Sequence, residues 1–145
     1  MSLPLEGIRV LDMTVVWAGP YSTMFLADMG AEVIRVESIN VFPSSTRGQQ
    51  ARPNKEAEAQ RPTSMYPNRD PGERAWNRSS MFNAHSRNKH SITINLASTE
   101  GKDIFKRLVE VSDVFIENNA LGSMERLGFT YPTLSQWNQQ LVMLS

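Results

Sequence analysis

The sequence predicts an α/β domain built on a mostly parallel, doubly wound sheet. Two observations carry this prediction. Short apolar segments typical of buried strands alternate with helical segments along the chain, and the first turn from a strand into a helix is marked by a glycine and a proline. The 145 residues are enough for one hydrophobic core. We therefore expect a single Rossmann-like domain over residues 1–145.

The first strand is predicted over residues 7–13, GIRVLDM. Pro20 suits the first turn of a helix because its missing N–H would have no partner there, and Gly19 lets the backbone turn tightly. The helix is predicted over residues 20–29, with Gly30 as its left-handed C-terminal stop. The segment AEVIRVE follows as a second strand, so this part of the chain forms one strand–helix–strand crossover of the usual right-handed, parallel type.

From about residue 39 to residue 90 the composition changes. Residues 38–90 hold five of the eight prolines and nine Lys or Arg against four acids, a net charge of +5 that leaves −5 for the rest. We expect a long, partly mobile excursion. Its charge suggests an anionic partner, with a solvated polar loop as the plain alternative, and the lack of interleaved aromatic residues argues against nucleic acid.

Regular elements return after this excursion. In HSITINLAS every second residue is apolar, which predicts a half-buried strand, and Ser98 or Thr99 caps the helix that follows. One face of that helix is apolar, formed by Ile104, Phe105, Leu108 and Val109. A fourth strand is predicted over residues 113–118, two short helical turns come next, and a fifth strand, QLVMLS, ends at Ser145 without a helix after it. The fold unit is thus expected to be incomplete at its C-terminus, with one sheet face poorly covered.

Composition excludes several classes of site and location. Cysteine is absent and the chain has two histidines, so disulfides, thiolate catalysis and a transition-metal site are not expected. No apolar run approaches the roughly 20 residues of a membrane-spanning helix, and the N-terminus lacks the pattern of a secretory leader. We expect a cytoplasmic protein without a membrane partner.

In open α/β sheets, ligands bind beyond the carboxyl ends of the strands, which makes the residues after each predicted strand the candidate site. The turn after the first strand has one glycine, whereas a dinucleotide fingerprint has three, and Trp17 would crowd a pyrophosphate there. An NAD-type domain is therefore disfavoured. Asp12 and Asp28 stand as isolated carboxylates with a surface or capping role, and His85 and His90 are either acid–base groups or solvated loop residues.

Three blocks of the sequence are similar to the N-terminal part of the family III CoA-transferases. They are PLEGIRVLDMTVVWAGPYSTMFLADMGAEVIRVE, RNKHSITINLASTEGKDIFKRLVEVSDVFIEN and MERLGFTYPTLSQWNQQLVMLS, and they leave out about residues 39–82. The resemblance implies coenzyme A or acyl-CoA as the bound substrate, a carboxylic acid as the acceptor, no metal, and a homo-oligomer. It also implies that this chain is the CoA-binding N-terminal portion of the large domain.

The resemblance further implies a set of CoA contacts. The first strand-to-helix turn supplies Val16, Trp17 and Ala18, and the block around the third strand supplies Arg87 and Lys89 for the phosphates and Ile94, Asn95, Leu96 and Ala97 for the adenine and ribose. The turn after the fourth strand supplies Asn118, Asn119 and Ala120 for the pantetheine, and Arg126 lies near the phosphates or forms a surface salt bridge. Ser38 stands where relatives often carry a basic residue, so Arg35 or the basic excursion would substitute for it.

In this family an aspartate attacks the acyl-CoA and forms an aspartyl-CoA thioester. The resemblance implies that this aspartate follows the last predicted strand, so we expect no catalytic residue in this truncated chain and no transfer by the chain alone. Two alternatives remain open from the sequence: a stand-alone, non-catalytic CoA or nucleotide-binding or assembly module, and a fragment of the α-methylacyl-CoA racemase type.

Overall fold

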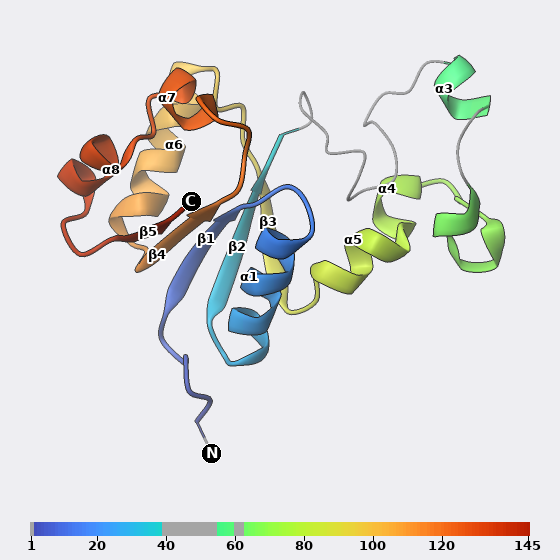
Figure 1. Cartoon of the computed structure of the whole chain (residues 1–145), viewed down its shortest axis with the longest axis horizontal. Helices are drawn as coiled ribbons and strands as arrows, with labels where there is room; N and C mark the ends of the chain where they lie inside the picture. The colour runs from blue at the N-terminus through green and yellow to red at the C-terminus, as the bar shows by residue number, and fades with distance from the viewer. Residues whose placement is uncertain (1, 39–54, 60–62) are drawn as a thin grey trace.

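The computed structural model describes residues 2–38, 55–59 and 63–145 (Figure 1). Its centre is a five-stranded sheet in the order β3-β2-β1-β4-β5, in which every pair of neighbours is parallel. The strands are β1 (Arg9–Met13), β2 (Glu32–Glu37), β3 (Lys89–Thr93), β4 (Val114–Glu117) and β5 (Val142–Leu144). The parallel, doubly wound sheet predicted from the sequence is confirmed.

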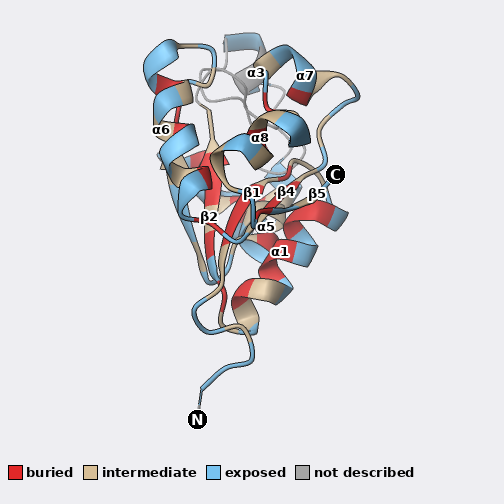
Figure 2. Cartoon of the chain, turned by 90° about the vertical axis from the view of Figure 1, so that its left-hand side faces the viewer, coloured by how far each residue is buried: buried red, intermediate tan, exposed pale blue. Residues whose placement is uncertain are grey.

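Helices cover the two faces of the sheet (Figure 2). The described helices are α1 (Ala18–Asp28), α3 (Lys55–Ala59), η1 (Thr63–Met65), η2 (Pro67–Arg69), α4 (Ala75–Arg78), α5 (Ser80–His85), α6 (Thr99–Glu110), α7 (Ser123–Leu127) and α8 (Tyr131–Trp137). α1 lies on one face and α6 and α8 lie on the other (Figure 2). α3 and α4 extend to the side of the sheet (Figure 1). None of the helices in the described part of the chain is both long and apolar enough to cross a membrane.

The hydrophobic core has two parts, one on each face of the sheet. On the α6 face, Phe105 packs against Phe115 and Phe129, with ring centroids 5.7 and 4.4 Å away. On the α1 face, Val10 and Val33 pack in one cluster with Ala27 of α1. Because both faces of the central strands are covered, these strands are apolar along most of their length, as parallel strands generally are.

Local signals at the helix ends agree with the structure. The Ser98 hydroxyl accepts a hydrogen bond from the Gly101 N–H at 3.1 Å, so Ser98 caps α6 as predicted. Gly30 follows α1 with a φ of 102°, which is the left-handed conformation expected of a C-terminal stop. α1 begins at Ala18 rather than at Pro20, so Pro20 lies in its first turn.

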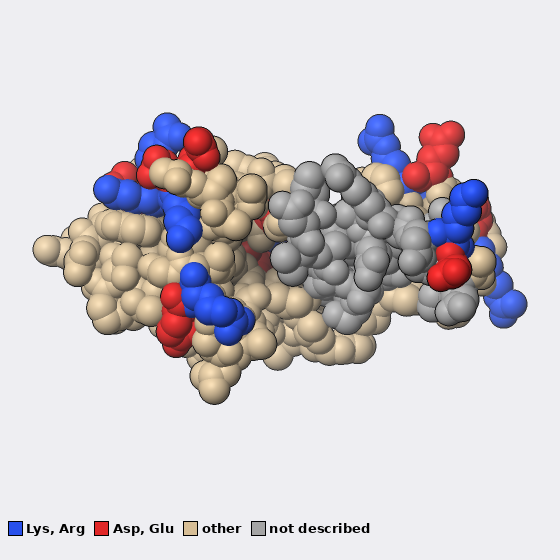
Figure 3. Space-filling view, turned by 90° about the horizontal axis from the view of Figure 1, so that it is seen from above, with Lys and Arg blue, Asp and Glu red and all other residues tan. Residues whose placement is uncertain are grey.

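The excursion between β2 and β3 has more structure than its composition suggests. Residues 39–54 and 60–62, where part of the predicted excursion falls, lie outside the described residues. In the part that is described, five short helices form, and Tyr66, Ala75, Ser79 and His85 are buried. On the face seen in Figure 3, Lys and Arg side chains are intermixed with Asp and Glu at both ends of the molecule.

Candidate functional site

A cavity of about 690 Å³ lies beyond the carboxyl ends of the strands. Its walls come from the ends of β1, β2 and β4 and from the loop after β3, and β1 and β4 are the neighbours at which the strand order reverses. It is lined by Met13, Thr14, Val15, Val16, Arg35, Val36, Glu37, Ser38, Asn95, Leu96, Ala97, Asn118, Asn119, Ala120, Ser123, Met124, Arg126 and Leu127. This is the place at which open α/β sheets bind their ligands, and its volume falls within the roughly 300–1,000 Å³ of cofactor pockets.

The turn after β1 is held in place by two asparagines that follow β4. The Asn118 side chain accepts a hydrogen bond from the Val15 N–H at 2.7 Å and donates one to the Val16 carbonyl at 2.9 Å. Asn119 donates to the Met13 carbonyl at 3.0 Å. Both amides therefore shape the wall of the cavity by binding its backbone.

Gly19 is required by close packing inside this turn. A Cβ atom at Gly19 would lie 2.6 Å from the Thr14 side chain and 2.8 Å from Cγ of Asn118. The positive φ in this turn belongs to Trp17, with φ 48° and ψ −96°, and not to Gly19. A non-glycine residue in this region is strained, and such strain persists only where the surroundings hold it.

The side chain of Trp17 lies outside the lining of the cavity. It is 59% exposed and packs edge-to-face on His85 of α5, with ring centroids 5.9 Å apart. In the first turn of α1, Ala18 is exposed and also lies outside the lining. Of the three residues predicted in this turn, Val16 is the one that the structure brings to the cavity.

The loop after β3 brings three predicted residues together. Asn95, Leu96 and Ala97 line the cavity, and Ala97 donates its N–H to the Asn95 side chain at 3.2 Å. The neighbouring Ile94 is 4% exposed and packs in the core on the α6 face, so it does not reach the cavity. Ile94 directly follows the last residue of β3 and packs in the same cluster as Ile92.

Charged groups of both signs face the cavity. Arg35 is 3% exposed, and its Nε donates to Oε1 of Glu37 at 3.0 Å. Glu37 also accepts a hydrogen bond from Ser91 at 2.8 Å. Arg126 is exposed at the rim, where its guanidinium donates to the Ser123 hydroxyl at 3.0 Å. Because Arg35 is buried and Arg126 is exposed, Arg126 is the more accessible of the two arginines to an anionic group in the cavity.

The two basic residues before and at the start of β3 are engaged elsewhere. Arg87 forms two hydrogen bonds to Oδ2 of Asp28, at 2.6 and 3.0 Å. The hydrogen bonds from Arg87 lower the pKa of the Asp28 carboxyl. The Lys89 side chain is 1% exposed and binds Asp12 at 2.9 Å. Together with Arg35 they border a separate cavity of about 250 Å³.

The expectation that Asp12 and Asp28 are isolated carboxylates is wrong. Asp12 is completely buried and lies between Lys89 and Arg35, and Asp28 is bound by Arg87. Burial by itself raises the pKa of Asp12, but the nearby charges of Lys89 and Arg35 and the hydrogen bond from Thr14 more than offset it, so the pKa falls below its ordinary 3.8. The signal that sequence reasoning missed is a polar residue at a core position of a central strand.

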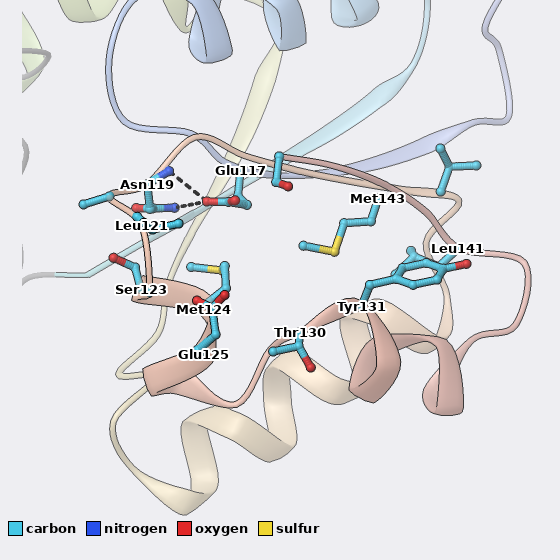
Figure 4. Close-up of a pocket in the computed structure, with 14 residues that line it drawn as sticks. Glu117, Asn119, Leu121, Ser123, Met124, Glu125, Thr130, Tyr131, Leu141 and Met143 are labelled. Atoms are coloured by element: carbon cyan, nitrogen blue, oxygen red, sulfur yellow. Dashed lines mark hydrogen bonds between the residues drawn. The ribbon is translucent and has the colours of Figure 1, made fainter.

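A second, more open cavity of about 820 Å³ lies between β5, α7 and α8 (Figure 4). It shares the wall around Asn119 and Met124 with the first cavity. Glu117 and Glu125 contribute two carboxylates, and none of the described residues that line it is Lys, Arg or His. An anionic ligand is therefore better matched by the first cavity, which has Arg35 and Arg126.

In the part of the chain that the structure describes, no group of three or more His, Asp or Glu is arranged to hold a metal ion. The lining of the first cavity combines asparagine amides, hydroxyl groups and apolar side chains with two arginines and the Glu37 carboxylate.

Comparison with known proteins gives one consistent family. The model of CoA-transferase family III matches residues 5–145. The chain is 37% identical over 141 residues to succinyl-CoA:mesaconate CoA-transferase of Haloarcula marismortui, covering 97% of this chain and 31% of that protein. It is also 37% identical over 141 residues to formyl-CoA:oxalate CoA-transferase of Streptomyces coelicolor, covering 97% of this chain and 29% of that protein.

A solved structure gives the same result. The chain superposes on the CAIB/BAIF family protein from Brucella suis with a TM-score of 0.75 at 32% identity, over 99% of this chain and 33% of that one. The chain thus spans about 30% of the length of the relatives that it matches, in their N-terminal part.

Proposed function

This chain belongs to CoA-transferase family III, and we propose that it forms the part of such an enzyme that binds coenzyme A. The observation that supports this proposal best is the cavity of about 690 Å³ at the carboxyl ends of the strands. The CoA contacts proposed there are Val16, Asn95, Leu96, Ala97, Asn118, Asn119, Ala120 and Arg126. Family membership supports coenzyme A as the ligand, and the geometry supports this cavity as its binding site.

The lining suits a long ligand that is apolar along part of its length and anionic elsewhere. Val16, Leu96 and Ala120 offer apolar surface along the cavity, as the pantetheine arm requires. Arg126 stands exposed at the rim and matches a phosphate, because guanidinium and phosphate form charge-assisted hydrogen bonds. The proposal therefore places the pantetheine inside the cavity and a phosphate beside Arg126.

A dinucleotide such as NAD fits this turn poorly. In a dinucleotide site, the glycines bring the backbone close to the pyrophosphate. Here the free side of Gly19 is filled by Thr14 and Asn118, at 2.6 and 2.8 Å from a Cβ position, so this glycine faces protein and not ligand. This packing favours CoA over NAD as the ligand to test.

We further propose that the whole protein transfers CoA from an acyl-CoA to a carboxylic acid. The matched relatives are named as succinyl-CoA:mesaconate and formyl-CoA:oxalate CoA-transferases. Among the described residues that line the cavity, Glu37 carries a carboxylate, but both of its oxygens already accept hydrogen bonds, from Arg35 and Ser91. Such a carboxylate is a poor nucleophile, which supports a nucleophilic aspartate outside residues 1–145.

The proposal can be tested by filling the cavity. Ala97→Trp places a large side chain among its lining residues, and Ala84→Trp makes the same change at an exposed position of α5, outside the cavity. We expect calorimetry to show CoA affinity reduced at least about tenfold for Ala97→Trp, a loss of about 1.4 kcal/mol, and unchanged for Ala84→Trp. Equal affinity for Ala97→Trp and the parent chain would contradict the assignment of this cavity.

A further inference from the structure

A buried ion pair lies beneath the first turn of α1. Alternation along β1 puts Val10 and Asp12 on the same face of the sheet, and Val10 packs with Ala27 of α1. Asp12 pairs in register with Arg35 on β2, and Lys89 begins β3 on the far side of β2. Asp12 is completely buried and the Lys89 side chain is 1% exposed. The ammonium thus reaches under α1 and across β2 to the carboxylate.

All three N–H donors of the Lys89 ammonium are used. Nζ donates to Oδ2 of Asp12 at 2.9 Å, to the Pro20 carbonyl at 2.8 Å and to Oγ1 of Thr23 at 2.7 Å. An ammonium has three donors, so none remains for a ligand phosphate. Releasing Lys89 would also leave Asp12 buried beside Arg35 alone, which stands 3.8 Å away. In this structure, Lys89 therefore uses its hydrogen bonds within the protein.

Asp12 and Lys89 form hydrogen bonds to both ends of the turn that lines the cavity. At the start, Asp12 accepts hydrogen bonds from the N–H and the hydroxyl of Thr14, the former at 2.9 Å. At the end, Lys89 binds the Pro20 carbonyl. Between them lies Trp17, with its strained φ of 48°. A strained backbone conformation of this kind persists only where neighbouring contacts hold it in place, and the hydrogen bonds of the ion pair are among those contacts.

Stability alone does not account for such a pair. Removing two charges from water costs about as much as their attraction returns, and apolar residues of similar volume are often equally stable. Resting on the proposed function, we infer that Asp12 and Lys89 are positioning residues for CoA binding: they hold the turn from Thr14 to Pro20 in the conformation that forms the cavity wall.

The test compares the double variant Asp12→Leu/Lys89→Met with the parent chain. Both charges leave together, and the buried Arg35 keeps its ion pair with Glu37 at 3.0 Å. No buried charge therefore remains unpaired, and we expect the urea midpoint to stay near that of the parent. CoA affinity should fall at least about tenfold, because the turn is no longer held. Amide hydrogen exchange of residues 14–22 should become faster. Lys106→Met, an exposed lysine on α6, is the matched control and should change none of these readouts.

If the double variant does not fold, a variant with a smaller change tests the same inference. Thr23→Val keeps the shape and both charges and removes the hydroxyl that bridges Asp12 and Lys89. It should speed exchange of residues 14–22 and weaken CoA binding several-fold. Parent-like exchange and CoA affinity in a folded variant would overturn the inference. If the parent chain itself binds no CoA, the proposed function fails, and exchange of residues 14–22 alone decides the positioning role: faster exchange supports it and unchanged exchange overturns it.

Discussion

Gly101 of α6 lies so close to the Asn95 carbonyl oxygen that a Cβ atom on the glycine would be 1.9 Å from it. The oxygen belongs to the backbone of the loop that carries Leu96 and Ala97 into the cavity. It cannot move aside unless the loop moves. Close packing of helix on loop, and not a positive φ, therefore requires glycine here.

Gly101→Ala should destabilise the fold by about 1–3 kcal/mol, the usual effect of forcing a methyl group into a filled space. Urea unfolding measures this loss. Asp103→Ala, at an exposed position of the same helix, is the control and should stay within about 0.5 kcal/mol of the parent. A Gly101→Ala chain as stable as the parent would show that the loop around Asn95 moves aside without a loss of stability.

Removal of the α6 cap should have a smaller effect. Ser98→Ala deletes the hydroxyl that accepts from the Gly101 N–H at 3.1 Å, so the free energy of unfolding should fall by about 1 kcal/mol. Ser98→Asp supplies another cap acceptor and should keep most of the stability. If Ser98→Asp is as unstable as Ser98→Ala in urea unfolding, the cap is not the cause.

Asn118→Ala should loosen the turn after β1. It removes the hydrogen bonds to Val15 and Val16, each worth about 1 kcal/mol, and it should weaken CoA binding as well. The control, Asn83→Ala at an exposed position of α5, should change neither quantity. Unchanged CoA affinity in Asn118→Ala, measured by calorimetry, would mean that the turn holds its conformation without this side chain.

The Asp28–Arg87 pair gives a prediction that depends on pH. Hydrogen bonds from Arg87 put the pKa of Asp28 below its ordinary 3.8. The pair therefore adds stability above about pH 3.8 and loses it as the pH falls through the lower, folded-state pKa. An NMR titration of the Asp28 carboxyl should show its pKa rising in Arg87→Met.

Adding CoA to the parent chain should leave the pKa of Asp28 where it is, because Arg87 does not line the proposed site. If CoA raises that pKa as much as Arg87→Met does, Arg87 leaves Asp28 to bind a CoA phosphate. The site would then need to be extended to β3.

The uncovered face of β5 predicts self-association. Val142 and Leu144 are 60% and 58% exposed on a strand at the edge of the sheet. Exposed apolar residues on an edge strand favour pairing with another chain. We expect light scattering after size-exclusion chromatography to give more than the monomer mass, and the double variant Val142→Lys/Leu144→Lys to shift it toward monomer. Val111→Lys, 56% exposed at the end of α6, is the control. A clean monomer for the parent chain at all concentrations would contradict this expectation.

Much of the fold could be predicted because its signals are local. The cap at Ser98 and the stop at Gly30 depend on a few neighbouring residues, and both are confirmed. The resemblance in turn led to the residues after β3 and β4, which the structure brings together around one cavity.

The features that sequence reasoning did not find depend on contacts between distant segments. Asp12 and Lys89 are 77 residues apart, so nothing near either one marks them as a pair. The direction of the Trp17 side chain follows from its backbone conformation and from His85, and neither can be inferred from the turn alone. A charged residue in the middle of a strand that is otherwise buried was the available clue to Asp12.

The CoA site is tested most directly by titrating the isotope-labelled chain with CoA and recording the shifts of its backbone amide signals in NMR spectra. CoA should shift the amides of Val16, Leu96, Ala97 and Asn118, which line the first cavity and not the second. The amides of Tyr131 and Val142 in the second cavity should stay in place. Shifts confined to the second cavity, or no shifts in a folded chain at millimolar CoA, would contradict the central claim that this N-terminal segment carries the CoA site.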